Sequence, residues 1–240
     1  MARVKERISD GRLLTLVEKY LKAGVLEELK GWEPTEQGTP QGAVISPLLA
    51  NLYLTPLDHL MAAAGCEMTR YADDFVVQCG SEQEARRALE RIQQWAQENG
   101  LTVHPTKTRI VDATRKGGFD FLGYHFERGM KWPREKSMDK LKEAIRSKTH
   151  RKQGKSLDQV IAEINPRLRG WFEYFKHSQS NIFGPLDGWI RMRLRSILRK
   201  YRGHRGRGRG ADHQRWPNAY FDKLGLFNLE RARRLAVQSR

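Results

Sequence analysis

The chain has 240 residues, of which 39% are hydrophobic and 30% are charged, and its formal net charge is +16 at pH 7. This length is enough for one large domain or for two small domains with hydrophobic cores. No stretch reaches the roughly 18 apolar residues that a membrane span needs, and no apolar run follows the first residues as in a signal peptide. The sequence therefore predicts a protein without a membrane-spanning segment.

The positive charge lies almost entirely in the second half of the chain. Residues 1–125 hold 15 Lys+Arg and 17 Asp+Glu, a net charge of −2, whereas residues 126–240 hold 29 Lys+Arg and 11 Asp+Glu, a net charge of +18. A break of this size indicates two functional halves, the second of which faces a polyanion such as a nucleic acid. A basic protein without such a partner is the alternative.

Cys66 and Cys79 are the only cysteines in the sequence. Two thiols without further metal-binding residues beside them are typical of proteins in a reducing compartment. We therefore expect a cytoplasmic protein.

In chain order, the first predicted helix begins with Ser9 as its cap and ends near Leu21, because its apolar residues recur at helical spacing. The loop of residues 38–42 follows and contains two glycines and a proline. Glycine lets a backbone approach a ligand closely, although a plain connector is the alternative. Ser46-Pro47 then predicts the start of a second helix, which Gly65 ends.

An acidic pair, Asp73 and Asp74, lies at the centre of residues 67–79. Apolar and β-favouring residues flank the pair on both sides, which predicts a strand, a tight turn and a second strand. Neighbouring carboxylates at a hairpin tip suit Mg²⁺, which prefers oxygen ligands and keeps waters and substrate phosphates in its other positions. Two such ions about 3.5–4 Å apart can serve a phosphoryl transfer. A solvated turn that binds nothing is the alternative.

After the hairpin, Ser81 and Glu84 predict a capping box for a helix that Gly100 ends. Short strands are expected at residues 101–103 and 109–111, with Lys107 between them.

Residues 119–126 alternate weakly and predict a further strand or hairpin. Helices interleaved with antiparallel strands indicate an α+β fold.

These blocks resemble the palm of a reverse transcriptase, and most of all those encoded by group II introns. Any single block is weak, whereas the ordered set is a specific signal. The blocks that carry the resemblance are Gly38-Thr39-Pro40-Gln41-Gly42, residues 45–53, Tyr71-Ala72-Asp73-Asp74, residues 101–107 and Phe121-Leu122-Gly123-Tyr124.

The resemblance implies roles for the residues of the nucleotide site. Asp73 and Asp74 would hold two catalytic Mg²⁺ ions, and Tyr71 would line the nucleotide site beside them. Gln41 and Gly42 would bring amide and backbone groups close to the nucleotide or the template.

The resemblance also implies roles for two later blocks. Lys107 resembles the lysine proposed to donate a proton to departing pyrophosphate, and a solvated surface lysine is the alternative. Leu122, Gly123 and Tyr124 resemble the primer grip, although Leu122 could equally be a core residue.

One departure from the family pattern concerns the third metal ligand. Family members carry an earlier aspartate in an apolar strand, and a fingers region, before the part that resembles residues 9–24. Asp10 lies at a predicted helix start and does not match that aspartate. We therefore expect a palm that is incomplete at its N-terminus and inactive as a polymerase on its own, with a separate fingers and palm fragment as a candidate partner.

The second half is predicted to be helical. Residues 134–149 form a basic amphipathic helix, Ser156 caps a second helix, and Asn165-Pro166 is expected to break it. A third helix then carries Trp171 and Phe175, which we expect in the core of a helix bundle.

Residues 165–171, together with Tyr174 and Phe175, resemble the maturase thumb, or domain X, of group II intron proteins. This is a second match to the same family. Arg167 and Arg169 are its candidate RNA-binding residues.

A fourth helix is expected from about Pro185 to Tyr201, with an apolar stripe and a parallel cationic stripe, and residues 216–240 are expected to add a short helical cap. The cationic stripe is expected to face phosphates and consists of Arg191, Arg195, Arg199 and Arg202. Residues 203–210 are too Gly-rich to fold alone, and Arg-Gly tracts follow RNA backbones. The candidate RNA-binding residues of this tract are Arg205, Arg207 and Arg209. A solvated charged face is the alternative.

Taken together, the sequence predicts an α+β fold in which residues 1–128 form a partial reverse-transcriptase palm and residues 129–240 form an α-helical thumb. The resemblance implies an RNA-directed DNA polymerase that joins a primer 3′-hydroxyl to the α-phosphate of a dNTP, using two Mg²⁺ ions. Its partners would be template or intron RNA and a DNA or RNA primer. The alternatives are an inactive maturase remnant that assists intron RNA folding, and a basic structural RNA-binding protein.

Overall fold

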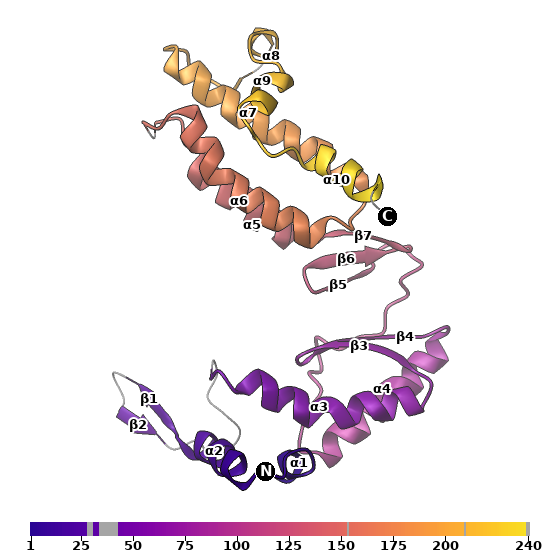
Figure 1. Cartoon of the computed structure of the whole chain (residues 1–240). Coiled ribbons are helices and arrows are strands. Elements are labelled where there is room, and N and C mark those ends of the chain that lie inside the picture. Colours follow the sequence, from indigo (N-terminus) through magenta and orange to yellow (C-terminus); the bar gives the residue numbers. More distant parts are fainter. Residues whose placement is uncertain (28–30, 34–42, 153, 209, 239–240) are drawn as a thin grey trace. The chain divides into compact units, whose positions relative to one another are not determined.

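The computed structural model describes residues 1–27, 31–33, 43–152, 154–208 and 210–238 (Figure 1). It consists of two compact units, Met1–Ile110 and Val111–Arg240. Residues 1–110 carry a net charge of −2 and residues 111–240 a net charge of +18, so the two units differ in charge as the two halves of the sequence do. No helix of the described residues is long and apolar enough to cross a membrane.

In the first unit, two long helices pack against one β-hairpin (Figure 1). Its elements are α1 (Ala2–Lys5), α2 (Gly11–Lys22), β1 (Val25–Glu27), β2 (Gly31–Glu33), α3 (Ser46–Ala63), β3 (Glu67–Tyr71), β4 (Asp74–Gln78) and α4 (Glu82–Glu98). The core joins Leu57 and Met61 of α3 to Ala88, Ile92 and Trp95 of α4. The three α4 residues recur at helical spacing, so one face of α4 is buried beneath the hairpin.

Two helix starts of the first unit differ from the predicted ones by one residue. Asp10, and not Ser9, caps α2, because its carboxylate accepts two backbone N–H bonds from the first turn. Helix α3 begins at Ser46 itself, with Ile45 in the cap position and no side-chain cap. Pro47 lies in the first turn, as expected, where its missing N–H has no helical partner to lose.

The start of α4 has half of the predicted capping box. Ser81 Oγ accepts the Glu84 N–H at 3.2 Å, as expected. Glu84 reaches one residue further back than predicted, and its carboxylate accepts the Gly80 N–H at 2.8 Å.

The prediction of strands at residues 101–103 and 109–111 is wrong, since neither segment forms a strand. The β3–β4 sheet has two strands, and neither segment pairs with it. Val103 instead packs against the core of the first unit. Its apolar side chain is therefore explained by packing and not by sheet formation.

The second unit combines a three-stranded antiparallel meander with a helical bundle (Figure 1). Its elements are β5 (Phe119–Phe121), β6 (Tyr124–Glu127), β7 (Met130–Pro133), α5 (Glu135–Lys148), α6 (Leu157–Phe175), the 3₁₀ helix η1 (Ser180–Ile182), α7 (Phe183–Tyr201), α8 (Ala211–Arg215), α9 (Asn218–Lys223) and α10 (Leu229–Gln238). One continuous core unites α5, α6, α7 and the C-terminal segments. The expected helical cap after residue 216 is present as α9 and α10.

The two compact units divide after Ile110, and the division into palm and thumb after residue 128 remains a prediction. Strands β5 to β7 belong to the second unit because they are bonded to its helices. Tyr174 Oη of α6 donates to the Leu122 carbonyl at 2.6 Å, and the Gln179 N–H donates to the Lys131 carbonyl at 3.0 Å. The strand segment that resembles the end of the palm is thus held by the helical bundle.

The predicted helix break at Asn165-Pro166 is wrong, since α6 runs through both residues. A proline inside a helix removes one backbone hydrogen bond. Burial of Ile164 and Leu168 on either side of it holds the helix in place. The Asn165 side chain also bridges to the C-terminal segment, donating to the Gly225 carbonyl and accepting from the Phe227 N–H, both at 2.8 Å.

The Arg-Gly tract is anchored to α7 at Gly208. The Gly208 N–H donates to Ser196 Oγ at 3.1 Å. A Cβ atom at Gly208 would lie 2.4 Å from the Arg195 Cβ and 3.2 Å from its carbonyl carbon. Only a residue without a side chain fits against the helix backbone at this point.

We therefore expect Gly208→Ala to lower the free energy of unfolding by about 1–3 kcal/mol, the usual cost of forcing a methyl group into a packed site. Gly188→Ala is the matched control on α7, where an added Cβ meets nothing within 4 Å. It should leave stability unchanged or raise it by up to about 1 kcal/mol, because alanine favours a helix. Chemical denaturation measures both changes, and equal effects of the two substitutions would contradict this packing.

Candidate active site and nucleic-acid interface

The acidic pair lies at a two-residue turn between β3 and β4. The register pairs Tyr71 with Asp74, which leaves Ala72 and Asp73 as the turn. Ala72 has φ 54°, in the left-handed region that residues with a Cβ atom disfavour. The predicted strand, turn and strand are therefore confirmed, with Asp73 in the turn and Asp74 opening the second strand.

Both carboxylates of the turn are exposed. Within the described residues, the side chains of Asp73 and Asp74 make no hydrogen bond or ion pair, and no third His, Cys, Asp or Glu joins them in a metal-binding group. The Tyr71 side chain beside them is 67% exposed. Free carboxylate oxygens suit a hard cation such as Mg²⁺, which can take its remaining ligands from water and phosphates.

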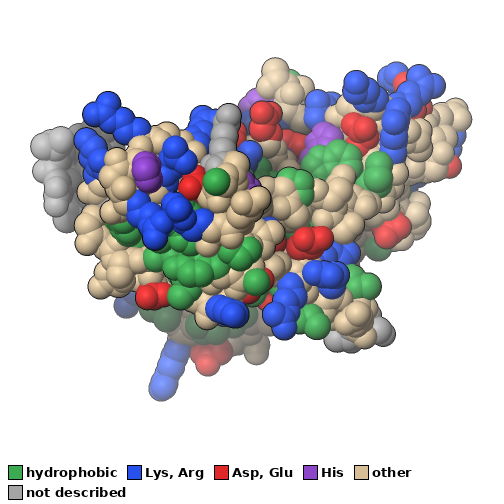
Figure 2. All heavy atoms as spheres, turned by 90° about the horizontal axis from the view of Figure 1, so that it is seen from above, with side chains coloured by type: hydrophobic (Ala, Val, Ile, Leu, Met, Phe, Trp, Pro, Cys, Tyr) green, Lys and Arg blue, Asp and Glu red, His purple; other side chains and the backbone are tan. Residues whose placement is uncertain are grey.

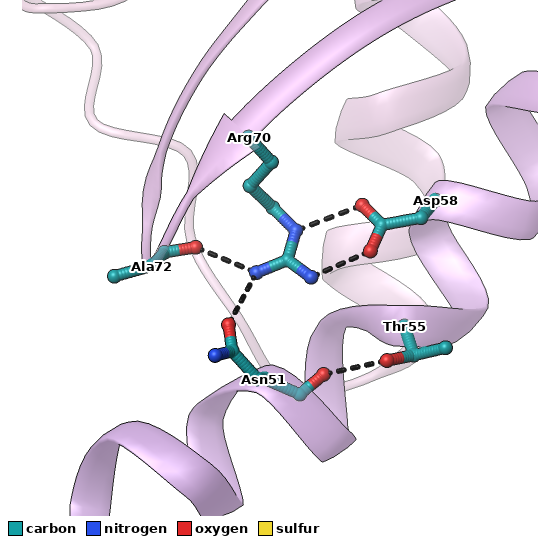
Figure 3. A network of polar contacts seen from close by, with 5 residues as sticks. All are labelled: Asn51, Thr55, Asp58, Arg70 and Ala72. Atoms are coloured by element: carbon teal, nitrogen blue, oxygen red, sulfur yellow. Dashed lines mark hydrogen bonds and ion pairs between the residues drawn. The ribbon is translucent and has the colours of Figure 1, made fainter.

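Arg70 ties the acidic turn to α3 (Figure 3). Its Nε and Nη2 donate to the two Asp58 carboxylate oxygens at 2.8 and 2.5 Å. Its Nη1 donates to Asn51 Oδ1 at 3.0 Å and to the Ala72 carbonyl at 2.8 Å. The hydrogen bonds to Asp58 raise the pKa of Arg70, and the guanidinium is charged in this network.

The other residues expected at the nucleotide site are less fully described. Gln41 and Gly42 lie outside the described residues. Lys107 is exposed in a turn after α4, and no hydrogen bond or ion pair of the described residues joins it to the hairpin. The roles expected for these three residues remain predictions.

The expected primer-grip residues form a second tight turn, between β5 and β6. Leu122 and Gly123 have φ values of 46° and 81°, and glycine favours such a conformation. Both carbonyl oxygens accept hydrogen bonds from side-chain hydroxyls. Tyr174 Oη donates to the Leu122 carbonyl, and Ser137 Oγ donates to the Gly123 carbonyl at 3.0 Å. The Tyr124 hydroxyl donates back to the Tyr174 carbonyl, and burial raises the pKa of Tyr124.

The expectation that the α7 arginine stripe faces phosphates is wrong for two of its members. Arg191 and Arg195 are only 8% and 2% exposed. Arg195 Nε donates to the Trp216 carbonyl at 2.9 Å, and Arg195 Nη2 donates to Asn218 Oδ1 at 2.8 Å. The segment from α8 to α9 covers this part of α7, so the Arg195 guanidinium binds that segment.

The remaining candidate arginines differ in exposure. Arg199 is half-buried and forms a 2.7 Å ion pair with Asp212. Arg209 lies outside the described residues. The exposed candidates of the second unit are Arg167, Arg169, Arg202, Arg205 and Arg207. Lys and Arg side chains occur at several places on the face drawn in Figure 2, with Asp and Glu between them.

Arg195→Met is expected to destabilise the second unit by about 2–3 kcal/mol, because it leaves a buried carbonyl and an amide without their charged donor. Arg167→Met on α6 is the matched control, because its side chain is exposed, and it should shift stability by less than about 0.5 kcal/mol. Thermal and chemical unfolding compare the two. If Arg195→Met had the same free energy of unfolding as wild type, the hydrogen bonds of Arg195 would not contribute to stability.

The Arg70 network was not predicted from the sequence. Asn51 and Asp58 are seven residues apart and therefore lie on one face of a helix, which is a signal that two polar side chains share a partner. Arg70 stands next to Tyr71 in the sequence, but nothing local shows that it pairs with α3.

Two family models match the chain. One is described as reverse transcriptase (RNA-dependent DNA polymerase) and matches residues 4–126. The other is described as group II intron, maturase-specific domain and matches residues 138–216. The chain belongs to the reverse transcriptase family, in its group II intron branch with a maturase-specific domain. The predicted family and α+β fold class are confirmed.

Several curated proteins are similar to parts of the chain. The group II intron-encoded protein LtrA of Lactococcus lactis subsp. cremoris is 50% identical over 52 residues, which cover 22% of this chain and 8% of the relative. The uncharacterized 91 kDa protein in cob intron of Schizosaccharomyces pombe is 28% identical over 172 residues, which cover 47% of this chain and 21% of the relative. The putative COX1/OXI3 intron 1 protein of Saccharomyces cerevisiae is 24% identical over 264 residues, which cover 85% of this chain and 31% of the relative. The chain thus spans 8% to 31% of these relatives' lengths.

Proposed function

We propose that this chain carries the metal-binding palm hairpin and the thumb of an RNA-directed DNA polymerase, in which Asp73 and Asp74 hold Mg²⁺. The observation that supports the proposal best is the acidic turn itself. Two adjacent carboxylates are exposed and unpaired within the described residues, in a chain of the reverse transcriptase family. A metal site needs carboxylate oxygens that the protein leaves free, and these two meet that requirement.

The proposed reaction joins a primer 3′-hydroxyl to the α-phosphate of a dNTP, opposite an RNA template, and releases pyrophosphate. Bound Mg²⁺ supplies Lewis-acid stabilisation of the charge on the phosphate oxygens. Asp73 and Asp74 bind and place the metal, and the exposed Tyr71 ring packs against the nucleotide. Lys107 gives a proton to the departing pyrophosphate, and Gln41 and Gly42 approach the nucleotide or template.

The second unit binds the nucleic acid in this proposal. Its net charge of +18 supports an RNA partner, and its exposed arginines are the candidate phosphate contacts. The turn of Leu122 and Gly123, with Tyr124, holds the primer. The free thiols of Cys66 and Cys79 support a reducing compartment, and we place the protein in the cytoplasm.

The competing function is an RNA-binding maturase without polymerase activity, which the same basic unit would support. The two functions differ in whether the acidic turn binds metal. Mn²⁺, which replaces Mg²⁺ at oxygen sites and is visible by electron paramagnetic resonance, distinguishes them. We expect the chain to bind Mn²⁺ at the turn and the double variant Asp73→Asn/Asp74→Asn to lose at least about tenfold in affinity. Equal Mn²⁺ binding by both proteins would exclude the turn as the metal site.

A further inference from the structure

We propose that Arg70 is a positioning residue for the acidic turn, because its guanidinium fixes the Ala72 carbonyl against α3 and thereby sets where the metal-binding carboxylates stand. The inference rests on the proposed function, since it concerns the metal site at Asp73 and Asp74. It assigns to Arg70, Asp58 and Asn51 a role in catalysis without contact to substrate or metal.

The guanidinium makes four hydrogen bonds that connect three elements (Figure 3). Two go to Asp58 and one to Asn51, both on α3, and the fourth goes to the Ala72 carbonyl in the turn. The Arg70 side chain is 10% exposed. A planar, largely buried fork with several fixed acceptors holds one geometry, unlike a surface ion pair between two mobile side chains.

The bond to Ala72 bears directly on the metal site. The Ala72 carbonyl and the Asp73 N–H belong to the same planar peptide unit. Holding the carbonyl oxygen therefore fixes the orientation of that unit and restricts where the Asp73 side chain can lie. Ala72 also has φ 54°, a conformation that a free alanine avoids. A disfavoured backbone conformation persists only where the surroundings determine it, and within the described residues Arg70 is the side chain that bonds to this turn.

The two turn carboxylates repel each other while no cation is bound. On a mobile turn they would move apart, and metal binding would have to bring them together again. A clamped backbone removes part of that cost before binding, which is the general benefit of a preorganised site.

Asp58 is the acidic residue of α3 in this network, but it does not compete for the role of metal ligand. Both of its oxygens accept hydrogen bonds from Arg70, at 2.8 and 2.5 Å. Its carboxylate orients the guanidinium, and the guanidinium orients the turn. The effect of Asp58 on the metal site therefore passes through Arg70.

The test measures Mn²⁺ affinity by electron paramagnetic resonance in Arg70→Lys, Asp58→Asn and Asn51→Ala. Lysine keeps the charge but presents a point-like ammonium that cannot span all three acceptors. We expect roughly tenfold weaker Mn²⁺ binding for Arg70→Lys and Asp58→Asn, and a smaller loss for Asn51→Ala, the range of losses seen for groups that orient metal ligands. In an active polymerase assembly, the Mg²⁺ concentration for half-maximal synthesis should rise in parallel while the KM for primer stays unchanged.

Two controls separate positioning from stability. Leu57→Val weakens the buried core of α3 next to Asp58 and should lower the unfolding temperature without changing Mn²⁺ affinity. Arg86→Lys alters an exposed arginine–carboxylate pair on α4 and should change neither the unfolding temperature nor the Mn²⁺ affinity. Wild-type Mn²⁺ affinity in Arg70→Lys and Asp58→Asn, or a loss in Leu57→Val as large as theirs, overturns the inference. If Arg70→Lys does not fold, the Mn²⁺ affinity of Asn51→Ala tests the inference. This variant removes one exposed hydrogen bond and should therefore fold. Failure of the Asp73→Asn/Asp74→Asn double variant to lose Mn²⁺ would instead refute the proposed function.

Discussion

Asp73→Asn and Asp74→Asn are each expected to lower RNA-templated DNA synthesis by at least about 10²–10³-fold, in any active assembly that contains this chain. Loss of a single preorganised electrostatic contributor commonly has an effect of this size, and here the lost group would hold the metal ion. The amide has nearly the volume of the carboxylate, so the turn should keep its conformation. The exposed position of both residues also predicts that neither variant loses much stability.

The matched control for these variants is Glu67→Gln, which removes a carboxylate from the same hairpin. Glu67 is exposed and opens β3, at the end away from the turn. It should leave the rate within about twofold of wild type, as expected for a surface substitution away from the site. RNA affinity should be the same in all of these variants. Wild-type rates of synthesis by either Asn variant would contradict the assignment of Asp73 and Asp74 as metal-binding residues.

Replacing the five exposed arginines of the second unit together is expected to weaken RNA binding and to flatten its salt dependence. The variant carries alanine at Arg167, Arg169, Arg202, Arg205 and Arg207. Each neutralised phosphate contributes about 0.7 to the log–log salt slope for single strands, so the slope should fall by up to about 3.5. The measurement is RNA affinity between 50 and 200 mM salt, approximately the range over which such contacts change affinity most visibly.

The control for the arginine variant is a set of exposed arginines on α4, in the unit with net charge −2. Arg86, Arg87 and Arg91 carry the same charge and lie outside the basic unit. Alanine at these three positions should leave the salt slope unchanged. If both sets flattened the slope equally, RNA binding would follow total charge and not a surface of the second unit.

Local sequence patterns predicted the parts of this fold that depend on local chemistry. The acidic hairpin follows from β-favouring residues on both sides of a turn, and Ser156 with Gln159 forms a reciprocal capping box where the cap was predicted. The α4 helix likewise follows from its cap and its apolar spacing. Each of these signals involves residues within a few positions of one another, which is the range over which such rules hold.

Apart from the cap positions, which shifted by one residue, the failures in α6 and α7 involve partners that lie far away in the sequence. The proline rule predicted a break in α6 because it cannot include the burial of Ile164 and Leu168 against other helices. Helical spacing correctly placed Arg191 and Arg195 on one stripe of α7, but spacing does not show what covers a stripe. Trp216 and the residues after it do so, and they come 21 or more positions later.

The Arg70 network was missed for the same reason. Its local pattern, an arginine before Tyr71 in a strand, fits an exposed strand residue as well as a clamp. Its acceptors on α3 precede it by 12 and 19 positions. Only the packing of α3 against the hairpin reveals that the acidic turn has a fixed support.

The most direct test of the central claim is extension of a DNA primer on an RNA template with Mg²⁺ and dNTPs. Because the chain spans only part of its relatives' lengths, the assay compares the chain alone with the chain mixed with a polypeptide that supplies the preceding part of a group II intron relative. We expect template-directed extension in the mixture and its loss with Asp73→Asn. RNA binding without extension in either arm, or extension that Asp73→Asn leaves intact, would contradict it.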